Sequence, residues 1–286
     1  MPLLACGILL TSVQSGLCAE VLPQRIVSLG PMNTKNIYLL GAENRLVANT
    51  VYCRSPEAAR RKEKIGTVLQ IDIEHIFSLR PDLVLATGLT QPQQINGLRR
   101  LGLRVVQFKE PKSFQDISSQ FLTLGRLLGL EKKTQAILSE VTGQLQAIRS
   151  SIAGLPPQKV LLQIGANPLF AATSTSFTHD YISLAGDVNI AAAEQSGRYN
   201  PEKVVAQNPD VIIIAIMGSQ TGLGLAEKKK WQEISSIGAT RNGRIFLIDP
   251  DLICSPTPVS FVEALTVISR LVHPELAGRT LLSARE

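Results

Sequence analysis

Two tyrosines and two arginines have side chains suited to holding an anionic or flat ligand: Tyr52, Arg54, Arg198 and Tyr199. An arginine guanidinium can form two parallel hydrogen bonds with a carboxylate or phosphate, and a tyrosine ring offers an apolar face with a polar tip. We expect all four to bind ligand. Any one of them could equally be a surface side chain at the rim of a cleft, so the prediction depends on the elements that place them.

The histidines argue against a site for a bare metal ion. His75, His179 and His273 are the only three, and none lies near another in sequence. A zinc or manganese site needs several histidine and carboxylate side chains that converge. We therefore expect no metal site and no resident cofactor, with His75 exposed and His179 capping a helix.

The sequence lacks the motifs of common hydrolases and nucleotide-binding enzymes. It contains no His-Glu-x-x-His, no Gly-x-Ser-x-Gly and no phosphate-binding Gly-x-x-x-x-Gly-Lys-Ser/Thr loop. Gly222-Leu223-Gly224 lacks the third glycine of a dinucleotide-binding turn, and we expect it to be a flexible loop. We expect the protein not to be an enzyme.

The elements that must position the ligand side chains occur in two related copies. Residues 74–85 and 202–213 share a glutamate, an aliphatic residue two positions later, Pro-Asp and a hydrophobic run, at a constant offset of 128 positions. Each copy predicts a short helix that ends at the proline, followed by a buried strand. A duplicated α/β unit implies two similar lobes with a cleft between them, and it places Glu74 and Glu202 at matching positions.

Strand and helix signals alternate, which predicts an α/β protein of two lobes with parallel sheets flanked by helices. The strands predicted for the first lobe are 25–29, 46–50, 82–86 and 104–108, with helices at 36–40 and 91–101. Those predicted for the second lobe are 159–164, 169–172, 210–216 and 244–248, with helices at 177–184 and 259–271.

The segment between the lobes is helical. Ser113 with Asp116 predicts the start of a helix that Gly129 ends. One long backbone helix is predicted over 131–152, about 33 Å at 1.5 Å per residue. Its apolar stripe indicates packing along both lobes, and consists of Ile137, Leu138, Val141, Leu145, Ile148 and Ile152. A single stiff helix at the junction predicts little closure on ligand binding.

In open parallel sheets, ligands bind beyond the carboxyl ends of the strands. Applied here, this rule selects 31–34, 52–55, 87–89, Asn167, 198–199, 217–219 and 249–251. It brings the two tyrosines and two arginines to one cleft and adds Asn33 and Asp251 as ligand-binding candidates.

Residues 1–19 are expected to be a secretory signal peptide cut after Ala19, because they carry no charge and include the apolar stretch 3–10. A cytoplasmic protein with a helical or disordered N-terminus is the alternative. Leu3-Leu4-Ala5-Cys6 would be a lipoprotein cleavage site if the true start lay upstream. We divide the rest into an N-terminal lobe (20–111), a linker with the long helix (112–154) and a C-terminal lobe (155–286), and predict a periplasmic protein, with a lipid-anchored form left open.

The 286 residues are 44% hydrophobic and 18% charged, with a formal net charge of +6. Basic residues are dispersed apart from 60–62 and 228–230, so we expect no nucleic-acid binding. The positive balance mildly favours an anionic small ligand. Cys53 and Cys254 lie in different halves, and we expect two unpaired thiols.

The order of several short motifs resembles the class III substrate-binding proteins of ABC importers over about residues 24–276. They are Arg25–Pro31, Leu40-Gly41-Ala42 with Arg45-Leu46-Val47, Lys64-Ile65-Gly66, both Glu…Pro-Asp units, Ser176-Phe177 through Asp180, Leu184-Ala185-Gly186 to Asn189-Ile190, and Arg198-Tyr199. That family has a helical-backbone receptor fold, and its members carry cobalamin, ferric siderophores, heme or bare metal ions.

The resemblance implies a membrane permease with separate ATPase subunits as partners and a monomeric carrier. In that family one glutamate on each lobe pairs with permease arginines, and Glu74 and Glu202 match those positions. Each also follows a predicted helix cap (Asp72, Asn200), where the helix dipole alone stabilises a carboxylate by about 0.3–1 kcal/mol.

Among the family's ligands, an anionic, oxygen-rich ferric siderophore suits Arg54 and Arg198 best. Cobalamin or heme needs broad apolar or aromatic walls, but aromatic residues make up only 5% of the chain and Trp231 lies outside the expected cleft. The aromatic residue often found in cobalamin binders is missing near Val68. Tyr52 or Tyr199 remains a possible heme ligand.

Three function classes stay open: a carrier, a sensor module that signals to a partner, and an enzyme on the same scaffold. Fold analogy does not separate a carrier from a sensor, whereas neighbouring permease and ATPase genes would.

Overall fold

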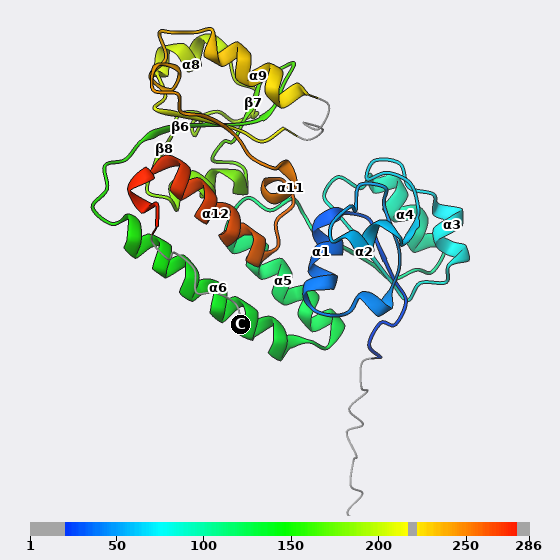
Figure 1. Ribbon diagram of the computed structural model, residues 1–286. Helices are drawn as coiled ribbons and strands as arrows, with labels where there is room; N and C mark the ends of the chain where they lie inside the picture. The colour runs from blue at the N-terminus through cyan, green and yellow to red at the C-terminus, as the bar shows by residue number, and fades with distance from the viewer. Residues whose placement is uncertain (1–20, 217–221, 279–286) are drawn as a thin grey trace, which may run out of the picture.

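The structure, a computed structural model, describes residues 21–216 and 222–278 and has two lobes (Figure 1). The predicted signal peptide, with its Leu3–Cys6 motif, lies outside the described residues. The N-terminal lobe contains a parallel sheet with strand order β3-β2-β1-β4-β5. Its strands are β1 (Ile26–Ser28), β2 (Leu46–Asn49), β3 (Glu63–Lys64), β4 (Leu83–Ala86) and β5 (Val105–Gln107). The four predicted strands are confirmed, and β3, a two-residue edge strand, is added to them.

Helices cover both faces of this sheet. They are α1 (Pro31–Leu39), α2 (Glu57–Arg60), α3 (Ile73–Ser78) and α4 (Pro92–Arg100), with a 3-10 turn η1 (Glu43–Arg45). Alternate strand residues face opposite sides, since Ile26 and Leu83 pack in one core cluster and Val27 and Val84 in another. A strand buried on both faces is a continuous hydrophobic run, which is why the sequence pattern located these strands.

The C-terminal lobe has the strand order β10-β9-β6-β7, with β8 also paired to β6. Its strands are β6 (Lys159–Gly165), β7 (Phe170–Ala171), β8 (Val188–Asn189), β9 (Val211–Ile214) and β10 (Ile245–Leu247). β8, β9 and β10 join the sheet in parallel, but β7 runs antiparallel to β6. The prediction of a parallel sheet is therefore wrong for β7, because the short 166–169 connection cannot make the crossover that a parallel neighbour needs.

The helices of this lobe are α7 (Asp180–Ser183), α8 (Pro201–Gln207), α9 (Leu223–Gln232), α10 (Gly238–Arg241), α11 (Pro250–Ile253) and α12 (Pro258–Val272), with 3-10 turns η2 (Phe177–His179) and η4 (Pro274–Leu276). α9 corrects the expected loop at 222–224, because Gly222 is its N-cap. A polar cluster holds it to β6: Gln163 Nε2 donates to Glu227 Oε2 (2.9 Å), and Trp231 Nε1 donates to Gln163 Oε1 (2.8 Å).

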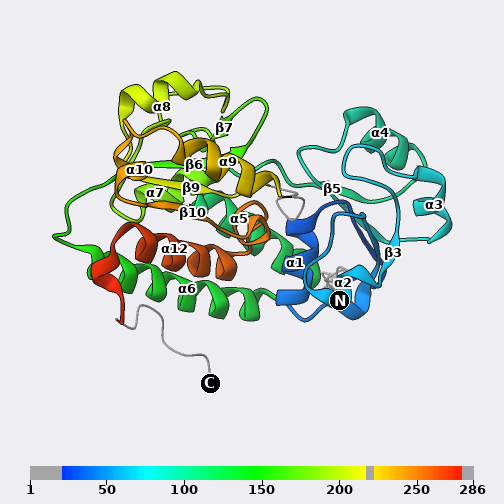
Figure 2. The ribbon, with the colours of Figure 1, turned by 45° about the horizontal axis from the view of Figure 1, so that its top comes forward.

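Two helices join the lobes, α5 (Phe114–Leu128) and α6 (Glu131–Ile152), and their predicted bounds are confirmed. α6 runs beneath the C-terminal lobe, and its N-terminal end reaches the N-terminal lobe (Figure 2). Ile137 and Leu138 pack against the N-terminal core, whereas Val141 and Ile148 belong to the C-terminal core. The apolar stripe therefore contacts both lobes as predicted.

α5 lies against α6 and also reaches both cores. Ile117 packs in the C-terminal lobe and Phe121 in the N-terminal lobe. The two helices approach closely at Gly125, where an added Cβ would lie 2.1 Å from Thr134 Oγ1. The junction is therefore a packed pair of helices.

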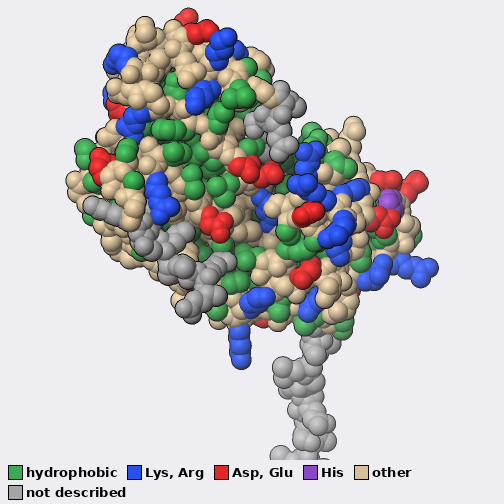
Figure 3. Space-filling model, viewed as in Figure 1, with side chains coloured by type: hydrophobic (Ala, Val, Ile, Leu, Met, Phe, Trp, Pro, Cys, Tyr) green, Lys and Arg blue, Asp and Glu red, His purple; other side chains and the backbone are tan. Residues whose placement is uncertain are grey.

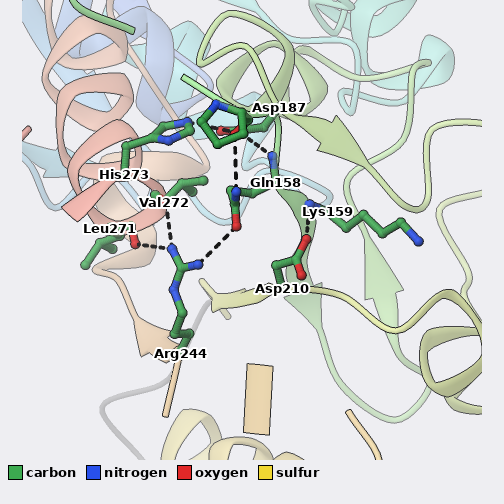
Figure 4. A network of polar contacts seen from close by, with 9 residues as sticks. Gln158, Lys159, Asp187, Asp210, Arg244, Leu271, Val272 and His273 are labelled. Atoms are coloured by element: carbon green, nitrogen blue, oxygen red, sulfur yellow. Dashed lines mark hydrogen bonds and ion pairs between the residues drawn. The ribbon is translucent and has the colours of Figure 1, made fainter. Parts of the chain in front are cut away.

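A buried polar network closes the far end of the C-terminal lobe (Figure 4). Asp187 Oδ1 accepts from Gln158 N (2.9 Å) and lies 3.2 Å from His273 Nε2. Arg244 Nη2 donates to Val272 O (2.6 Å) at the end of α12. Burial raises the pKa of Asp187, opposed by the Gln158 N–H and by His273 and Arg244.

Candidate functional site

A cavity of about 250 Å³ lies between the lobes at the carboxyl ends of the N-terminal strands. Its lining comes from the segments that follow all five strands of that lobe, from one residue of α5, and from two residues after α11 of the C-terminal lobe. The lining residues are Pro31, Met32, Asn33, Tyr52, Val68, Thr87, Leu89, Phe108, Lys109, Glu110, Pro111, Gln120, Cys254 and Ser255. The segments 31–34, 52–55 and 87–89, selected from the sequence, thus meet in one place. We call this space the interlobe cavity.

Apolar side chains form much of its wall. Tyr52 is 48% exposed and Leu89 52%, so both present apolar surface that a ligand could cover. Phe108 and Val68 add more deeply buried apolar surface. Burying exposed apolar surface contributes about 25 cal/mol per Å², so these residues offer binding energy without a specific charge.

Asn33 lines the cavity but is largely buried in its wall. It is only 5% exposed, and its Nδ2 donates to Ala86 O (3.3 Å) and, more weakly, to Leu85 O (3.5 Å). The side chain therefore ties α1 to the end of β4. It shapes the cavity wall, but these bonds occupy its amide nitrogen.

Glu110 is a cavity residue that the sequence analysis missed. Burial raises the pKa of its carboxyl group, against a hydrogen bond from the Gly88 backbone. An added Cβ at Gly88 would lie 2.8 Å from Glu110 N, so only glycine fits there without rearrangement. No local pattern marks this pair, because it forms only when the ends of β4 and β5 lie side by side.

Arg54 and Asp251 line a second pocket, of about 340 Å³, beside the interlobe cavity. The other residues around it are Val51, Cys53, Arg60 and Lys64. Figure 3 shows Lys and Arg side chains gathered on the N-terminal lobe next to the hollow between the lobes. We call this space the basic pocket.

The structure places Arg198 and Tyr199 elsewhere. Arg198 is exposed and pairs through its backbone with Phe170. Tyr199 is only 7% exposed, and its hydroxyl donates to Ile190 O (3.0 Å). Burial raises the pKa of that hydroxyl. Tyr199 is therefore a core residue, and neither side chain is among those that line the two spaces.

The remaining segments selected from the second lobe contribute unequally. Asn167 has a φ of 54° and is not among the lining residues. Residues 217–219 lie outside the described residues. Asp251 adds to the basic pocket and to a groove of about 400 Å³ beside α1 and α12, and its carbonyl accepts from Lys35 Nζ (2.7 Å).

No group of three or more His, Cys, Asp or Glu side chains is arranged to hold a metal ion within residues 21–216 and 222–278. His75 Nε2 lies 2.7 Å from Glu63 Oε1, and His179 Nδ1 lies 3.1 Å from Asn189 Nδ2. His179 occupies the N-cap position of α7 as expected, but its side chain makes no capping hydrogen bond, and Ser176 caps the preceding 3-10 turn.

Both cysteines of the described chain are free, as expected. Cys53 is fully buried and its sulfur accepts a hydrogen bond from Thr34 Oγ1 (3.2 Å). Cys254 lines the interlobe cavity, and burial raises its pKa to about 11. The Cys254 thiol is therefore protonated at neutral pH.

Glu74 and Glu202 occupy equivalent places on the two lobes. Each is the second residue of its helix, α3 or α8, and each is exposed. Asp72 Oδ1 accepts from His75 N (2.9 Å) and Asn200 Oδ1 accepts from Glu202 N (2.8 Å), so both predicted caps are present. Neither glutamate side chain forms an ion pair with a described residue. Figure 1 shows α3 and α8 on different lobes.

The molecule has two α/β lobes, a pair of packed helices at their junction, and a ligand-sized cavity between the lobes. This is the architecture of a ligand carrier. No helix in the described ranges is long and apolar enough to cross a bilayer. The sequence profile of the periplasmic binding proteins matches residues 26–252, and the chain belongs to that family, as a class III member of the type that serves ABC importers.

Individual relatives agree with this assignment. The chain is 26% identical over 262 residues to YvrC of Bacillus subtilis, an uncharacterized ABC transporter substrate-binding lipoprotein, covering 88% of this chain and 81% of YvrC. It is 28% identical over 200 residues to the vitamin B12-binding protein of Yersinia pseudotuberculosis, covering 69% and 71%. The apo structure of the periplasmic heme-binding protein RhuT from Roseiflexus has a TM-score of 0.76 at 25% identity, covering 88% of this chain and 98% of RhuT.

Proposed function

We propose that this protein is the substrate-binding component of an ABC importer that captures a metal chelate in the interlobe cavity and delivers it to a membrane permease. The observation that carries the proposal is the meeting of the segments after all five strands of one lobe with Cys254 and Ser255 of the other around that cavity. Separate subunits hydrolyse ATP, and this chain works as a monomer without catalysis. It is exported to the periplasm after loss of residues 1–19, or is anchored through a lipid as its relative YvrC is.

A ferric siderophore is the favoured cargo. The interlobe cavity, at about 250 Å³, is slightly smaller than the ligand-pocket range of about 300–1,000 Å³. A compact chelate fills such a space, with a part extending to Arg54 in the basic pocket. The one strongly exposed aromatic ring of the lining is Tyr52, which is little for a wide flat macrocycle.

Cobalamin and heme are the second candidates, because relatives carry those names. The apolar wall of Tyr52, Leu89, Val68 and Phe108 would serve either ring system. The Tyr52 phenol is half exposed and could reach a heme iron.

Isothermal titration calorimetry with ferric siderophores, cobalamin and heme tests the proposal. Tryptophan fluorescence is a poor reporter, because Trp231 is buried in the C-terminal core with its Nε1 bonded to Gln163. We expect one chelate class to bind, and Tyr52→Ala to weaken it by about tenfold or more. Phe77→Ala is the matched control, since Phe77 is 49% exposed on α3, outside the cavity lining.

Uptake by cells separates a carrier from a sensor. Loss of the gene should abolish uptake of the bound chelate, and the wild-type gene should restore it. If no chelate bound, or if uptake continued without the gene, the proposal would be wrong.

A further inference from the structure

The basic pocket holds three cationic side chains, Arg54, Arg60 and Lys64, and one carboxylate, Asp251. We propose that it is an anion subsite that takes a carboxylate, catecholate or phosphate group of the cargo while the body of the cargo lies in the interlobe cavity. This inference rests on the proposed function and specifies the charge of the cargo that the same cleft accepts.

The three cations have no carboxylate partner among the residues that the structure describes. Arg60 Nε donates to Arg54 O (2.9 Å), and Lys64 Nζ donates to Asn49 Oδ1 (2.6 Å) and Ala59 O (3.0 Å). All three acceptors are neutral oxygens. Like charges gathered around one pocket repel each other, and an anion bound among them removes that repulsion.

These contacts also fix where the charges lie. The bond to Arg54 O uses only the Nε of Arg60, so the two terminal nitrogens of its guanidinium stay available for a forked contact. Lys64, at the end of β3, is held from two sides, by Asn49 at the end of β2 and by Ala59 of α2. Burial lowers the pKa of Lys64, and a bound anion would favour its charged form.

The pocket opens beside the interlobe cavity because both use the loop that follows β2. Tyr52 lines the cavity, whereas Val51, Cys53 and Arg54 line the pocket. The C-terminal lobe borders both spaces, with Asp251 at the pocket and Cys254 at the cavity. One cargo molecule can therefore contact Tyr52 with its body and the arginines with an anionic arm.

The Asp251 carboxylate does not cancel the pocket's charge. Its electrostatic attraction is shared with Lys35, whose Nζ donates to the carbonyl of the same residue. Two kinds of anionic oxygen fit the remaining positive charge: the carboxylates or catecholates of a siderophore, and a phosphate diester such as the one in cobalamin.

Calorimetry on the full chain tests the subsite with two chelates of different charge, a ferric tris-catecholate with three negative charges and a neutral ferric tris-hydroxamate. The variant is Arg54→Gln/Arg60→Gln. The control, Arg99→Gln/Arg100→Gln, removes the same charge from α4. We expect the variant to weaken the anionic chelate about a hundredfold, about tenfold for each arginine, and the neutral one by less than about threefold. The control should change neither by more than about threefold.

Equal losses for both chelates, or no loss for either, would overturn the subsite while leaving chelate capture intact. Free citrate and inorganic pyrophosphate are the second probe, and a preference between them separates a carboxylate from a phosphate arm. If the wild type bound no chelate, the proposed function would fail, and these two anions would decide the subsite alone. If the wild type binds citrate or pyrophosphate and the Arg54→Gln/Arg60→Gln variant does not, the anion subsite is supported. If the wild type binds neither anion, the anion subsite is refuted.

Discussion

Lys35 Nζ on α1 donates a hydrogen bond to Asp251 O on α11 at 2.7 Å, and this bond joins the two lobes across the floor of the cleft. Burial lowers the pKa of Lys35, whereas the nearby carboxylates of Asp251 and Asp249 oppose the shift. The lysine therefore lies in a partly desolvated place where its charge is held by the opposite lobe. Asp251 also lines the basic pocket, and Cys254, three residues further along the chain, lines the interlobe cavity.

Lys35→Met should loosen α11 without unfolding the protein. The methionine keeps the apolar stem but leaves the Asp251 carbonyl without its donor. We expect faster amide hydrogen exchange in 249–255, measured by mass spectrometry. Lys133→Met is the matched control, since Lys133 Nζ donates to Leu40 O (2.9 Å) at the base of the N-terminal lobe, and it should leave 249–255 unchanged.

Closure on cargo binding should be small. The lobes share α5 and α6, which pack side chains into both cores, so a hinge would have to break apolar contacts. We expect the radius of gyration from small-angle scattering to change by less than about 1 Å when a chelate binds. Gly125→Val places a side chain against Thr134 and should loosen the junction, which would enlarge the change. A large closure by the wild type would contradict this account of the junction.

Glu74 and Glu202 should matter for delivery and not for capture. Both side chains are exposed on helices of opposite lobes, away from the cavity lining. Replacing both with alanine should leave chelate affinity within about twofold. We predict that it abolishes uptake with the cognate permease, since our docking hypothesis assigns these two charges to fixing the register of each lobe on a permease subunit.

The control for docking uses two other exposed first-turn glutamates. Glu57→Ala/Glu131→Ala removes the same charge from the first turn of α2 and α6, where each glutamate is the first helical residue. Uptake by this control should equal that of the wild type. Normal uptake by the Glu74/Glu202 variant would show that these carboxylates only stabilise their helices.

The sequence located the elements that local signals define. α6 begins at Glu131 and ends at Ile152 as predicted, because its apolar stripe and its neighbours Gly129 and Gly154 mark both ends. The strands of the repeated unit were found because each is buried on both faces. The N-terminal-lobe segments that line the interlobe cavity followed from parallel topology alone.

Side chains whose direction depends on distant pairing were not predictable. Tyr199 N donates to Leu169 O, and this pairing with the segment before β7 turns its ring into the core. The surroundings of Glu110 and Lys35 depend on residues far away in the sequence, Gly88 for the first and Asp251 for the second. α9 was not predicted from the sequence because this helix contacts β6 through the polar side chain of Glu227 and lacks an apolar stripe.

Asp187 should couple stability to pH. Its side chain is fully buried, and Oδ2 has no hydrogen-bond partner in the described part of the chain. The pKa of the Asp187 carboxyl group is higher in the folded protein than its value of 3.8 in the unfolded chain. Its contribution to stability is therefore complete below pH 3.8 and is lost as the pH rises through the folded-state pKa. Relative to Asp187→Asn, the wild type should therefore lose unfolding free energy between about pH 4 and pH 7.

Urea unfolding at the two pH values measures that difference. Asp210→Asn is the control, because Asp210 Oδ2 accepts from Lys159 N (2.8 Å) in the same lobe but lies less deeply buried. If wild type and Asp187→Asn changed in parallel, burial would not govern this carboxyl. Asp187→Ala should cost about 1–3 kcal/mol at either pH, since it leaves the Gln158 N–H without its acceptor.

Cys254 should report occupancy of the interlobe cavity. A pKa of about 11, against an ordinary 9.0, lowers the thiolate fraction near pH 8 by about a hundredfold, so alkylation should be slow and should rise about tenfold per pH unit. Because Cys254 lines the cavity, a bound chelate should slow its alkylation further. Peptide mass spectrometry separates it from Cys53, which is buried and should label more slowly still. If saturating chelate left the Cys254 rate unchanged, the cargo would have to bind somewhere other than this cavity.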